Sequence, residues 1–467
     1  MTATTVADIV VDGLARATTP RIFTVERASS VVAVSQAVER RRLPIVSADS
    51  GAAATLMAAV TGELADAPGA VILAAAADAR AGLRYASASR APLIAMVERS
   101  VGAEAASLVK GVVEAEPMSA AHWIAHAVQL AMRDPRGPVV VRVARDAATE
   151  AALPVRTSLR PAVAPPSSAA LDDAARLLVS AVRPVLVVGL ECRTGDAGGW
   201  LRPFVETLPA PTLTTLKGKG VLPDPHPLAF GLVSSAVGRS LLERADLVVT
   251  VGVDAVELRS RPWPITTPLL HLGRTSHADA LGAKVELIGD IALTLEELAP
   301  RLRARSRADW DVAELDRLKR SATARARSEP SRESRILHIA RELMPAGTIA
   351  TVGLVAHVDA AAAAWPAVAP NELLIDAELP DFASAAAVAS ALHHADRQVI
   401  CVTSTPALDA IERLACSIVT VSLGPVAASR SGVATVTARD EATLRVALDW
   451  FVRQKGPALV DASSIED

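Results

Sequence analysis

The chain has 467 residues and a formal net charge of −3, with 51% hydrophobic and 21% charged residues. A chain of this length exceeds what one hydrophobic core can organise, and its apolar content excludes an intrinsically disordered protein. With 3% aromatic residues and no excess of positive charge, the sequence also lacks the usual features of a nucleic-acid-binding surface.

The amino-terminal segment, MTATTVADIVVDGLARA, has no basic region followed by an apolar stretch, and no run approaches the length of about 18 apolar residues that a membrane span needs. The three cysteines, Cys192, Cys401 and Cys416, do not have the spacing of metal ligands, so we interpret them as reduced, packed thiols. We therefore expect a soluble, cytoplasmic protein without membrane or nucleic-acid partners.

Short β-branched runs recur along the chain, and each is followed by an alanine-rich segment with helical spacing. These runs lie at residues 43–49, 69–76, 92–98, 138–144, 184–189, 247–252, 268–273, 348–353, 399–404 and 418–423. Apolar strands that alternate with helices are typical of parallel sheets covered on both faces. The predicted fold class is α/β with doubly wound parallel sheets.

Two segments interrupt this alternation. Residues 148–170 are rich in Pro, Ser and Ala, which favours a linker. Residues 301–335 are densely charged with both signs, which indicates a solvated connecting helix. The predicted domains are therefore 1–150, 165–300 and 330–467.

The middle of the chain carries the most specific motifs. The segment RPVLVVGLECRTGDAGGWLRPFVETLPAPTLTTLKGKGVLPDPHPLAFGLV (183–233) and the segment RADLVVTVGVD (244–254) closely resemble the central domain of thiamine-diphosphate enzymes of the acetolactate synthase and 2-oxoacid decarboxylase family. LPIVSADSGAAATLMAAVTGEL (43–64) resembles that family's pyrimidine-binding segment, and ASALHHADRQVICVT (389–403) resembles part of its diphosphate-binding domain. The resemblance covers essentially the whole chain.

The resemblance implies a pyrimidine-binding-like domain, a central domain and a shortened diphosphate-binding-like domain. It also implies a homodimer or a dimer of dimers, because this family builds its sites between the pyrimidine and diphosphate domains of different subunits. In the family, a carboxylate on the pyrimidine domain activates the cofactor. A Gly-Asp-Gly turn with a later asparagine holds magnesium on the diphosphate, and an apolar side chain bends the cofactor.

These family positions are altered in this sequence. Asp49 occupies the position of the activating glutamate and is one methylene shorter. Ser404, Thr405 and Pro406 replace the Gly-Asp-Gly turn, which removes the metal carboxylate and one N–H donor. The asparagine region is matched by residues 422–425, of which serine alone has a polar side chain.

The remaining positions have also changed. Pro380 stands where the apolar wedge is expected, with Glu378 and Asp381 beside it. Two loops of the pyrimidine domain are matched by the glycine-free segments 74–79 and 24–27. We therefore expect no cofactor, and magnesium thiamine diphosphate in particular is not expected to bind.

Several residues keep two interpretations. Asp49 is either an acid or base in the interface cleft, or it shares with Ser50 the capping of the next helix. His122 and His126 lie one helical turn apart and could share a metal, but no third ligand accompanies them, so no metal site is predicted.

The loop with Lys217, Lys219 and His226 corresponds to a segment that lines the flavin in flavin-containing synthases. It is either a nucleotide or flavin site in the central domain or a structural loop whose glycines form the turn.

Three functions remain open at this point. The first is a cofactor-independent enzyme, of lyase-like or transferase-like ancestry, that acts on a small oxo acid or related anion with Asp49 as acid or base. The second is a non-catalytic partner subunit of an active paralogue. The third is an atypical thiamine-diphosphate-dependent decarboxylase or carboligase, which is disfavoured because Glu378 and Asp381 would repel an unneutralised diphosphate.

Overall fold

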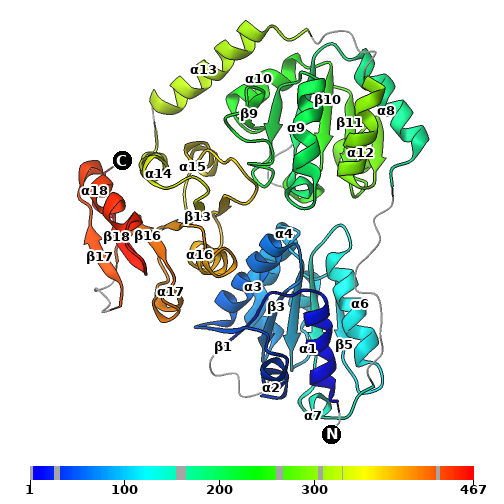
Figure 1. Cartoon of the computed structure of the whole chain (residues 1–467), viewed down its shortest axis with the longest axis vertical. Coiled ribbons are helices and arrows are strands. Elements are labelled where there is room, and N and C mark those ends of the chain that lie inside the picture. The colour runs from blue at the N-terminus through cyan, green and yellow to red at the C-terminus, as the bar shows by residue number, and fades with distance from the viewer. Residues whose placement is uncertain are drawn as a thin grey trace.

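The computed structural model describes residues 4–25, 32–153, 165–258, 267–302, 309–328, 330–426 and 432–466. Its named strands form three six-stranded sheets that follow one another along the chain. Every pairing within these sheets is parallel. The predicted α/β class with three doubly wound domains is therefore confirmed (Figure 1).

The first domain has the strand order β2-β1-β3-β4-β6-β5. One face of its sheet packs on α3 and α4, and the other on α1, α2 and α6. Its elements are α1 (Val6–Arg16), β1 (Ile22–Val25), α2 (Val32–Arg41), β2 (Ile45–Ala48), α3 (Gly51–Ala65), β3 (Gly69–Leu73), the 3-10 helix η2 (Ala76–Ala79), α4 (Arg80–Ala88), β4 (Leu93–Val97), α5 (Ala103–Ser107), β5 (Gly111–Glu114), α6 (Ala120–Met132), β6 (Pro138–Arg142) and α7 (Arg145–Ala148).

The central domain has the strand order β12-β11-β10-β7-β8-β9. Helices α8, α9 and α12 cover one face, and α10 with the start of α13 covers the other. Its elements are α8 (Ser168–Ser180), β7 (Pro184–Val188), η3 (Leu190–Arg193), α9 (Ala197–Thr207), β8 (Thr212–Thr214), β9 (Ala229–Leu232), α10 (Ala236–Arg244), β10 (Leu247–Val251), η4 (Ala255–Leu258), β11 (Leu269–Gly273), α11 (Ala278–Leu281), β12 (Val285–Ile288), α12 (Ile291–Leu298) and η5 (Ala299–Leu302).

The third domain has the strand order β14-β13-β15-β16-β18-β17. Helix α16 covers the face that looks towards the first domain, and α14, α15 and α18 cover the other face. After the connecting helix α13 (Val312–Ser328), its elements are α14 (Arg332–Leu343), β13 (Ile349–Gly353), α15 (Val358–Ala364), β14 (Leu373–Asp376), α16 (Phe382–His393), β15 (Val399–Thr403), α17 (Asp409–Arg413), β16 (Ile418–Ser422), β17 (Ala434–Thr437), α18 (Glu441–Val452) and β18 (Ala458–Asp461).

The first and third domains share one hydrophobic core. It includes Ala58 and Ala59 of α3 and Ala386 and Ala387 of α16, all of which are completely buried. Alanine side chains let two helices approach closely, so the two domains are joined by packing as tight as that within a domain. Both helices lie between the two sheets (Figure 1).

The loop after β8 joins all three domains. Lys217 reaches Glu63 and Tyr85 of the first domain. Asp224, at the end of the loop, accepts a hydrogen bond of 2.8 Å from the backbone N–H of Ala367 in the third domain. Gly218 lies against the backbone of β7, where a Cβ atom would come within 2.3 Å of the Val188 carbonyl oxygen. Glycine is therefore required there by close approach rather than by a ligand.

The charged segment between the last two domains is only partly solvated. Helix α13 crosses from the central to the third domain (Figure 1). Trp310, just before it, is 7% exposed and donates a hydrogen bond of 3.0 Å to the Pro184 carbonyl. The expectation of a solvated helix is thus wrong for its amino-terminal end, which apolar residues anchor to the central domain.

Three further predictions concern the cysteines, the linker between the first two domains and membrane-spanning helices. Cys192, Cys401 and Cys416 are free and buried, as packed thiols would be. The predicted linker falls between the end of α7 at Ala148 and the start of α8 at Ser168, and its residues 154–164 lie outside the described residues. In the described part of the chain, no helix combines the length and apolar character that crossing a bilayer requires.

Candidate functional site

Asp49 and Ser50 divide the two roles that the sequence left open. The Ser50 hydroxyl accepts a hydrogen bond of 3.1 Å from the Ala53 N–H and caps α3. Asp49, at the end of β2, forms an ion pair with Arg413 of α17, and Arg413 also donates to the Ser47 carbonyl at 2.7 Å. The Asp49 side chain is 40% exposed. A carboxylate and a guanidinium therefore meet where the first and third domains face each other.

The turn after β15 uses its polar groups within the chain. The Ser404 hydroxyl donates to the Leu354 carbonyl at 3.1 Å, and the Thr405 N–H lies 3.4 Å from the Thr403 hydroxyl oxygen. Pro406 has no N–H, and the Ala407 N–H donates to the Ser384 hydroxyl at 3.0 Å. Of the backbone groups that such a turn can offer to an anion, the N–H groups of Thr405 and Ala407 are therefore engaged within the chain, and Pro406 offers none.

The loop after β16 closes against this turn. The Ser422 hydroxyl donates to the Gly424 carbonyl at 2.9 Å. A Cβ atom on Gly424 would lie 2.2 Å from the Ser404 carbonyl oxygen, so the two backbones are in direct contact. Residues 427–431, which follow, lie outside the described residues. The space between the two strand ends is filled by backbone on the part of the chain that the structure describes.

The segment before α16 presents acids rather than an apolar wedge. Pro380 is exposed, while Leu379 is buried in the core shared by the first and third domains. Glu378 forms an ion pair of 2.6 Å with Arg84 of the first domain. Asp381 precedes α16 in the left-handed conformation, with φ of 62°. Glu378 therefore ties the two domains together across this segment.

The two loops of the first domain predicted to have lost their glycines can be placed in part. Thr24 lies in β1 and donates to the Ile72 carbonyl at 3.2 Å, whereas Glu26 and Arg27 lie outside the described residues. Residues 76–79 form η2, residues 74 and 75 connect it to β3, and Gly51 packs directly on Asp78 of that helix. Helix η2 therefore lies beside the start of α3 and close to Asp49.

Both lysines of the central loop are engaged by acids. Lys219 forms an ion pair of 2.5 Å with Asp224. The ammonium group of Lys217 lies 3.3 Å from a Glu63 oxygen, 3.1 Å from the Tyr85 hydroxyl and 4.8 Å from the centre of the Tyr85 ring. The geometry supports the structural interpretation of this loop, because a nucleotide phosphate would have to displace these acids.

The group around Lys217 is almost completely enclosed. Glu63 is 4% exposed, accepts a hydrogen bond of 2.5 Å from the Tyr85 hydroxyl and pairs with Arg193 of η3. Burial, together with the Arg193 charge, lowers the pKa of Lys217 to about 7. Burial also lowers the pKa of Arg193 to about 10 and raises the pKa of Tyr85. This network joins the first and central domains.

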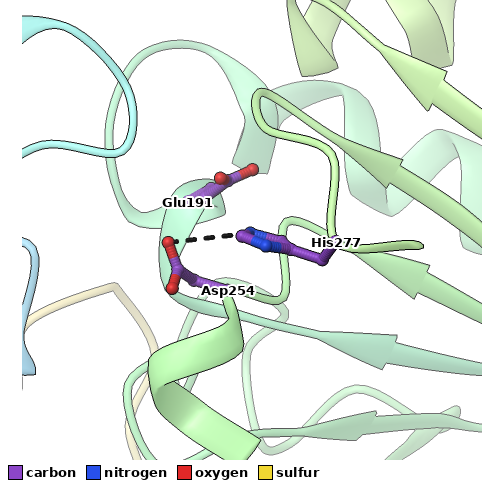
Figure 2. A group of neighbouring side chains, drawn as sticks. All are labelled: Glu191, Asp254 and His277. Carbon is purple, nitrogen blue, oxygen red and sulfur yellow. Dashed lines mark ion pairs between the residues drawn. The ribbon is translucent and has the colours of Figure 1, made fainter. Parts of the chain in front are cut away.

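A second polar group lies at the carboxyl ends of three neighbouring central strands. Glu191 follows β7, Asp254 follows β10 and His277 follows β11, so the sheet order brings them together (Figure 2). Their ligand atoms all lie within 4.8 Å of one another. We call Glu191, Asp254 and His277 the strand-end triad. Within the described residues, these three side chains form the group of potential metal ligands that has this spacing. His122 and His126 are not part of such a group.

The strand-end triad is buried by the first domain. Arg90 donates through two nitrogens to Asp254, each at 2.9 Å, and a small pocket beside the triad is lined by side chains of both domains. Burial raises the pKa of Glu191 to about 8 and lowers the pKa of His277. His271, whose ring centre is 5.7 Å from that of His277, uses both ring nitrogens on Thr250 and Thr275.

The structure therefore brings together some predicted site residues and separates others. Asp49 lies beside the third domain of the same chain, and Ser404, Thr405 and Pro406 form a turn at the end of a parallel strand. The site between two subunits that the resemblance implied stays a prediction. His122 and His126 lie on α6 with ring centres 6.4 Å apart and belong to no larger ligand group in the described residues. The strand-end triad was not predicted, although each member stands three or four residues after the last residue of a strand.

Comparisons with known proteins agree with the fold. Residues 171–298 match the family model described as thiamine pyrophosphate enzyme, central domain. The chain is 27% identical over 293 residues to the acetolactate synthase isozyme 1 large subunit of Escherichia coli, covering 59% of this chain and 51% of that protein. It is 25% identical over 321 residues to the acetolactate synthase of Bacillus subtilis, covering 62% of this chain and 56% of that protein. The matched part thus spans about half the length of these relatives.

A solved structure shares the architecture. It is described as a putative thiamin diphosphate-dependent enzyme from Mycobacterium smegmatis, and it aligns with a TM-score of 0.82 over 99% of this chain and 100% of that chain, at 19% identity. At this identity the likeness concerns the fold. Together, the match of the central domain, the acetolactate synthase relatives and the shared three-domain fold support a relationship of the chain to the thiamine diphosphate-dependent enzyme family.

Proposed function

We propose that this chain is an acetolactate-synthase-like enzyme that works without magnesium thiamine diphosphate and acts on a small oxo acid or a related anion. The observation that carries the loss of the cofactor is the state of the turn at Ser404, Thr405 and Pro406. The Ser404 hydroxyl and the N–H groups of Thr405 and Ala407 bond to the chain itself, Pro406 has no N–H, and no carboxylate stands where the family places its magnesium ligand.

The charges around this turn support the same proposal. Glu378 and Asp381 lie on the segment that would face the diphosphate, and helix α17 has Asp409 and Glu412 in its first turn. A diphosphate needs a divalent cation or basic groups to balance its charge. Acidic groups at the same place oppose it.

The pair of Asp49 and Arg413 supplies the chemistry for an oxo acid. A guanidinium group binds a carboxylate through two parallel hydrogen bonds, so Arg413 is suited to the carboxylate of the substrate. A substrate that takes Arg413 from Asp49 leaves the Asp49 carboxylate free to move a proton. In this proposal Arg413 binds and orients the substrate, and Asp49 is the acid or base.

The test uses the full chain purified in a chelator and freed of thiamine diphosphate. Binding and turnover of a panel of 2-oxo acids, pyruvate first, are measured by saturation-transfer NMR and by product analysis. Asp49→Asn is expected to keep binding and lose turnover, and Arg413→Met is expected to lose binding. Asp381→Asn, which removes an acid that makes no capping hydrogen bond at the start of α16, is the matched control and is expected to retain both.

Turnover that requires added thiamine diphosphate, or activity that survives in Asp49→Asn, would contradict this proposal. Absence of both binding and turnover across the panel would favour the second candidate, a non-catalytic partner subunit of an active paralogue.

One observation favours that partner role. Three contacts within the chain close the region between the first and third domains, namely the Asp49–Arg413 pair, the Glu378–Arg84 pair and a hydrogen bond of 2.5 Å from Arg21 to the Leu392 carbonyl. The partner role is tested by co-expression with a full-length acetolactate synthase paralogue and light scattering of the purified product. A defined mixed oligomer with raised synthase activity is expected for a partner, and separate homo-oligomers are expected for an independent enzyme.

A further inference from the structure

The strand-end triad contains two buried polar atoms that lack hydrogen bonds in the described part of the chain. Oε1 of Glu191 and Nε2 of His277 both have no hydrogen-bond partner there, and the two residues are 5% and 9% exposed. An unsatisfied buried carboxylate oxygen or imidazole nitrogen destabilises the fold, so such atoms require an explanation. Nε2 of His277 faces Oδ2 of Asp254 at 3.7 Å, and the Glu191 carboxylate lies beside both (Figure 2).

The spacing of these atoms suits a small cation. A tetrahedral metal with bonds of about 2.0–2.1 Å holds its ligand atoms about 3.4 Å apart. The His277–Asp254 distance of 3.7 Å is within a few tenths of an ångström of that value. The Glu191 oxygen, within 4.8 Å of the other two atoms, needs a movement of about an ångström, which a glutamate side chain can make by rotation.

Neighbouring groups hold Glu191 and the backbone of His277 without using Oε1 of Glu191 or Nε2 of His277. Oε2 of Glu191 accepts a hydrogen bond of 2.7 Å from the backbone N–H of Arg274, which leaves Oε1 for the cation. The backbone N–H of His277 donates to Glu286 at 3.0 Å and fixes the loop that carries the imidazole. Outer groups that fix the orientation of ligands are typical of metal sites in proteins.

Asp254 already forms an ion pair with a side chain of the protein, Arg90. Arg90 binds both of its oxygens, and Oδ1 also accepts a hydrogen bond of 2.9 Å from the Val256 N–H. A carboxylate oxygen has two lone pairs, so Oδ2 can accept from Arg90 and still bind a metal. Three other guanidinium groups line the same pocket: Arg193 pairs with Glu63, Arg136 pairs with Asp66, and Arg274 donates to the Thr194 hydroxyl and carbonyl.

From these observations we infer that Glu191, Asp254 and His277 bind one divalent metal ion, with zinc as the favoured ion. One imidazole nitrogen and two carboxylate oxygens are a donor set that zinc accepts, with water as a fourth ligand. The site is distinct from the magnesium position of the family, because it lies at the carboxyl ends of β7, β10 and β11 in the central domain. Metal binding requires ionised Glu191, so a proton is released when the ion enters.

The metal site would act at the contact between two domains. Asp254 would bind the ion and also accepts hydrogen bonds from Arg90 of the first domain. By holding the Asp254 side chain in place, the ion would stabilise the contact between Arg90 and the central domain. The inference does not depend on catalysis by this chain, and it holds whether the chain is an enzyme or a partner subunit.

The test is a titration of the full chain with zinc after chelator treatment, followed by calorimetry at neutral pH. One tightly bound ion per chain is expected. Glu191→Gln and His277→Ala are each expected to weaken binding at least about tenfold. Because His277→Ala removes a buried side chain, the nearly isosteric Glu191→Gln serves as the variant that keeps the fold. Cobalt absorption in the visible range, sensitive to His277→Ala, provides an independent readout of nitrogen ligation.

The matched control is the double variant His122→Ala and His126→Ala, which removes the other close pair of histidines described above. It is expected to bind zinc like the wild type. Loss of binding in this control, unchanged affinity in Glu191→Gln, or absence of any bound zinc in the wild type would overturn the inference.

Discussion

At the residue scale, the start of α3 shows how neighbouring polar side chains take different tasks. Ser50 caps the helix, whereas Asp49 pairs with Arg413 at an exposed position. A capping hydroxyl accepts a hydrogen bond from a backbone N–H that has no other partner in the helix. Removing the hydroxyl therefore lowers the stability of the protein by the full contribution of the cap. An exposed ion pair competes with water and contributes little.

We therefore predict that Ser50→Ala lowers the free energy of unfolding by about 1 kcal/mol. Asp49→Asn is expected to change it by less than about 1 kcal/mol. Urea denaturation followed by circular dichroism measures both values. A larger loss in Asp49→Asn than in Ser50→Ala would show that the acid, rather than the serine, holds the start of the helix.

Lys217 gives a pH dependence with a definite sign. Its pKa is about 7 in the folded protein, and an unfolded lysine titrates near 10.5. Between these values the unfolded chain binds more protons at this residue, so its contribution to stability rises with pH. Below about pH 7 the lysine is charged in both states and the contribution is constant.

The comparison that isolates this effect is Lys217→Met, which keeps the length of the side chain without its charge. We expect the wild type to gain stability relative to Lys217→Met as the pH rises from about 7 to about 10, as measured by denaturation at each pH. If the free energy of unfolding of the wild type minus that of Lys217→Met stays constant or falls over this range, the buried ammonium is not destabilised by its surroundings.

At the scale of elements, the close packing of helices α3 and α16 requires small side chains between them. Ala386 is completely buried in the core that the first and third domains share. Extra methylene groups in such a core force side chains and backbone apart, at a typical cost of about 1–3 kcal/mol.

Ala386→Leu is accordingly expected to lower the free energy of unfolding by about 1–3 kcal/mol. Ala442→Leu, at an exposed position of α18, serves as the control and is expected to have little effect. Denaturant unfolding of both variants tests this, and equal stability of the two would contradict the close packing of α3 against α16.

The elements also show what the sequence could indicate and what it could not. Every apolar run identified in the sequence coincides with a strand, because a strand buried on both faces has a continuous apolar pattern. The other strands are three or four residues long, and β5 has an exposed Val112 at 45%. A strand of three or four residues is too short to show a periodic pattern that separates it from a loop, whether it lies at the edge of a sheet, as β5 does, or inside it, as β1 and β8 do.

The candidate site was predictable in the same uneven way. Asp49 and the turn at Ser404 stand within motifs that resemble a family pattern, so their positions could be predicted. Glu191, Asp254 and His277 come from separate strands, and only the order of the strands in the sheet brings them together. The partners of Lys217 likewise lie in another domain, more than 130 residues away along the chain.

At the scale of the whole molecule, the three domains are joined by two different kinds of contact. The first and third domains share an apolar core, whereas the first and central domains meet through charged groups such as Glu63, Arg193 and Arg90. The proposed zinc would belong to the charged contact, and the proposed loss of the diphosphate site concerns the apolar one. The two proposals can therefore fail independently.

The most direct test of the central claim is calorimetry and thermal unfolding of the purified full chain with thiamine diphosphate and magnesium. We predict no saturable heat and no shift of the unfolding transition. A ligand present at a hundred times its dissociation constant would stabilise the folded chain by about 2.7 kcal/mol. Saturable binding of one cofactor per chain, with a shift of that size that disappears when magnesium is chelated, would contradict the account.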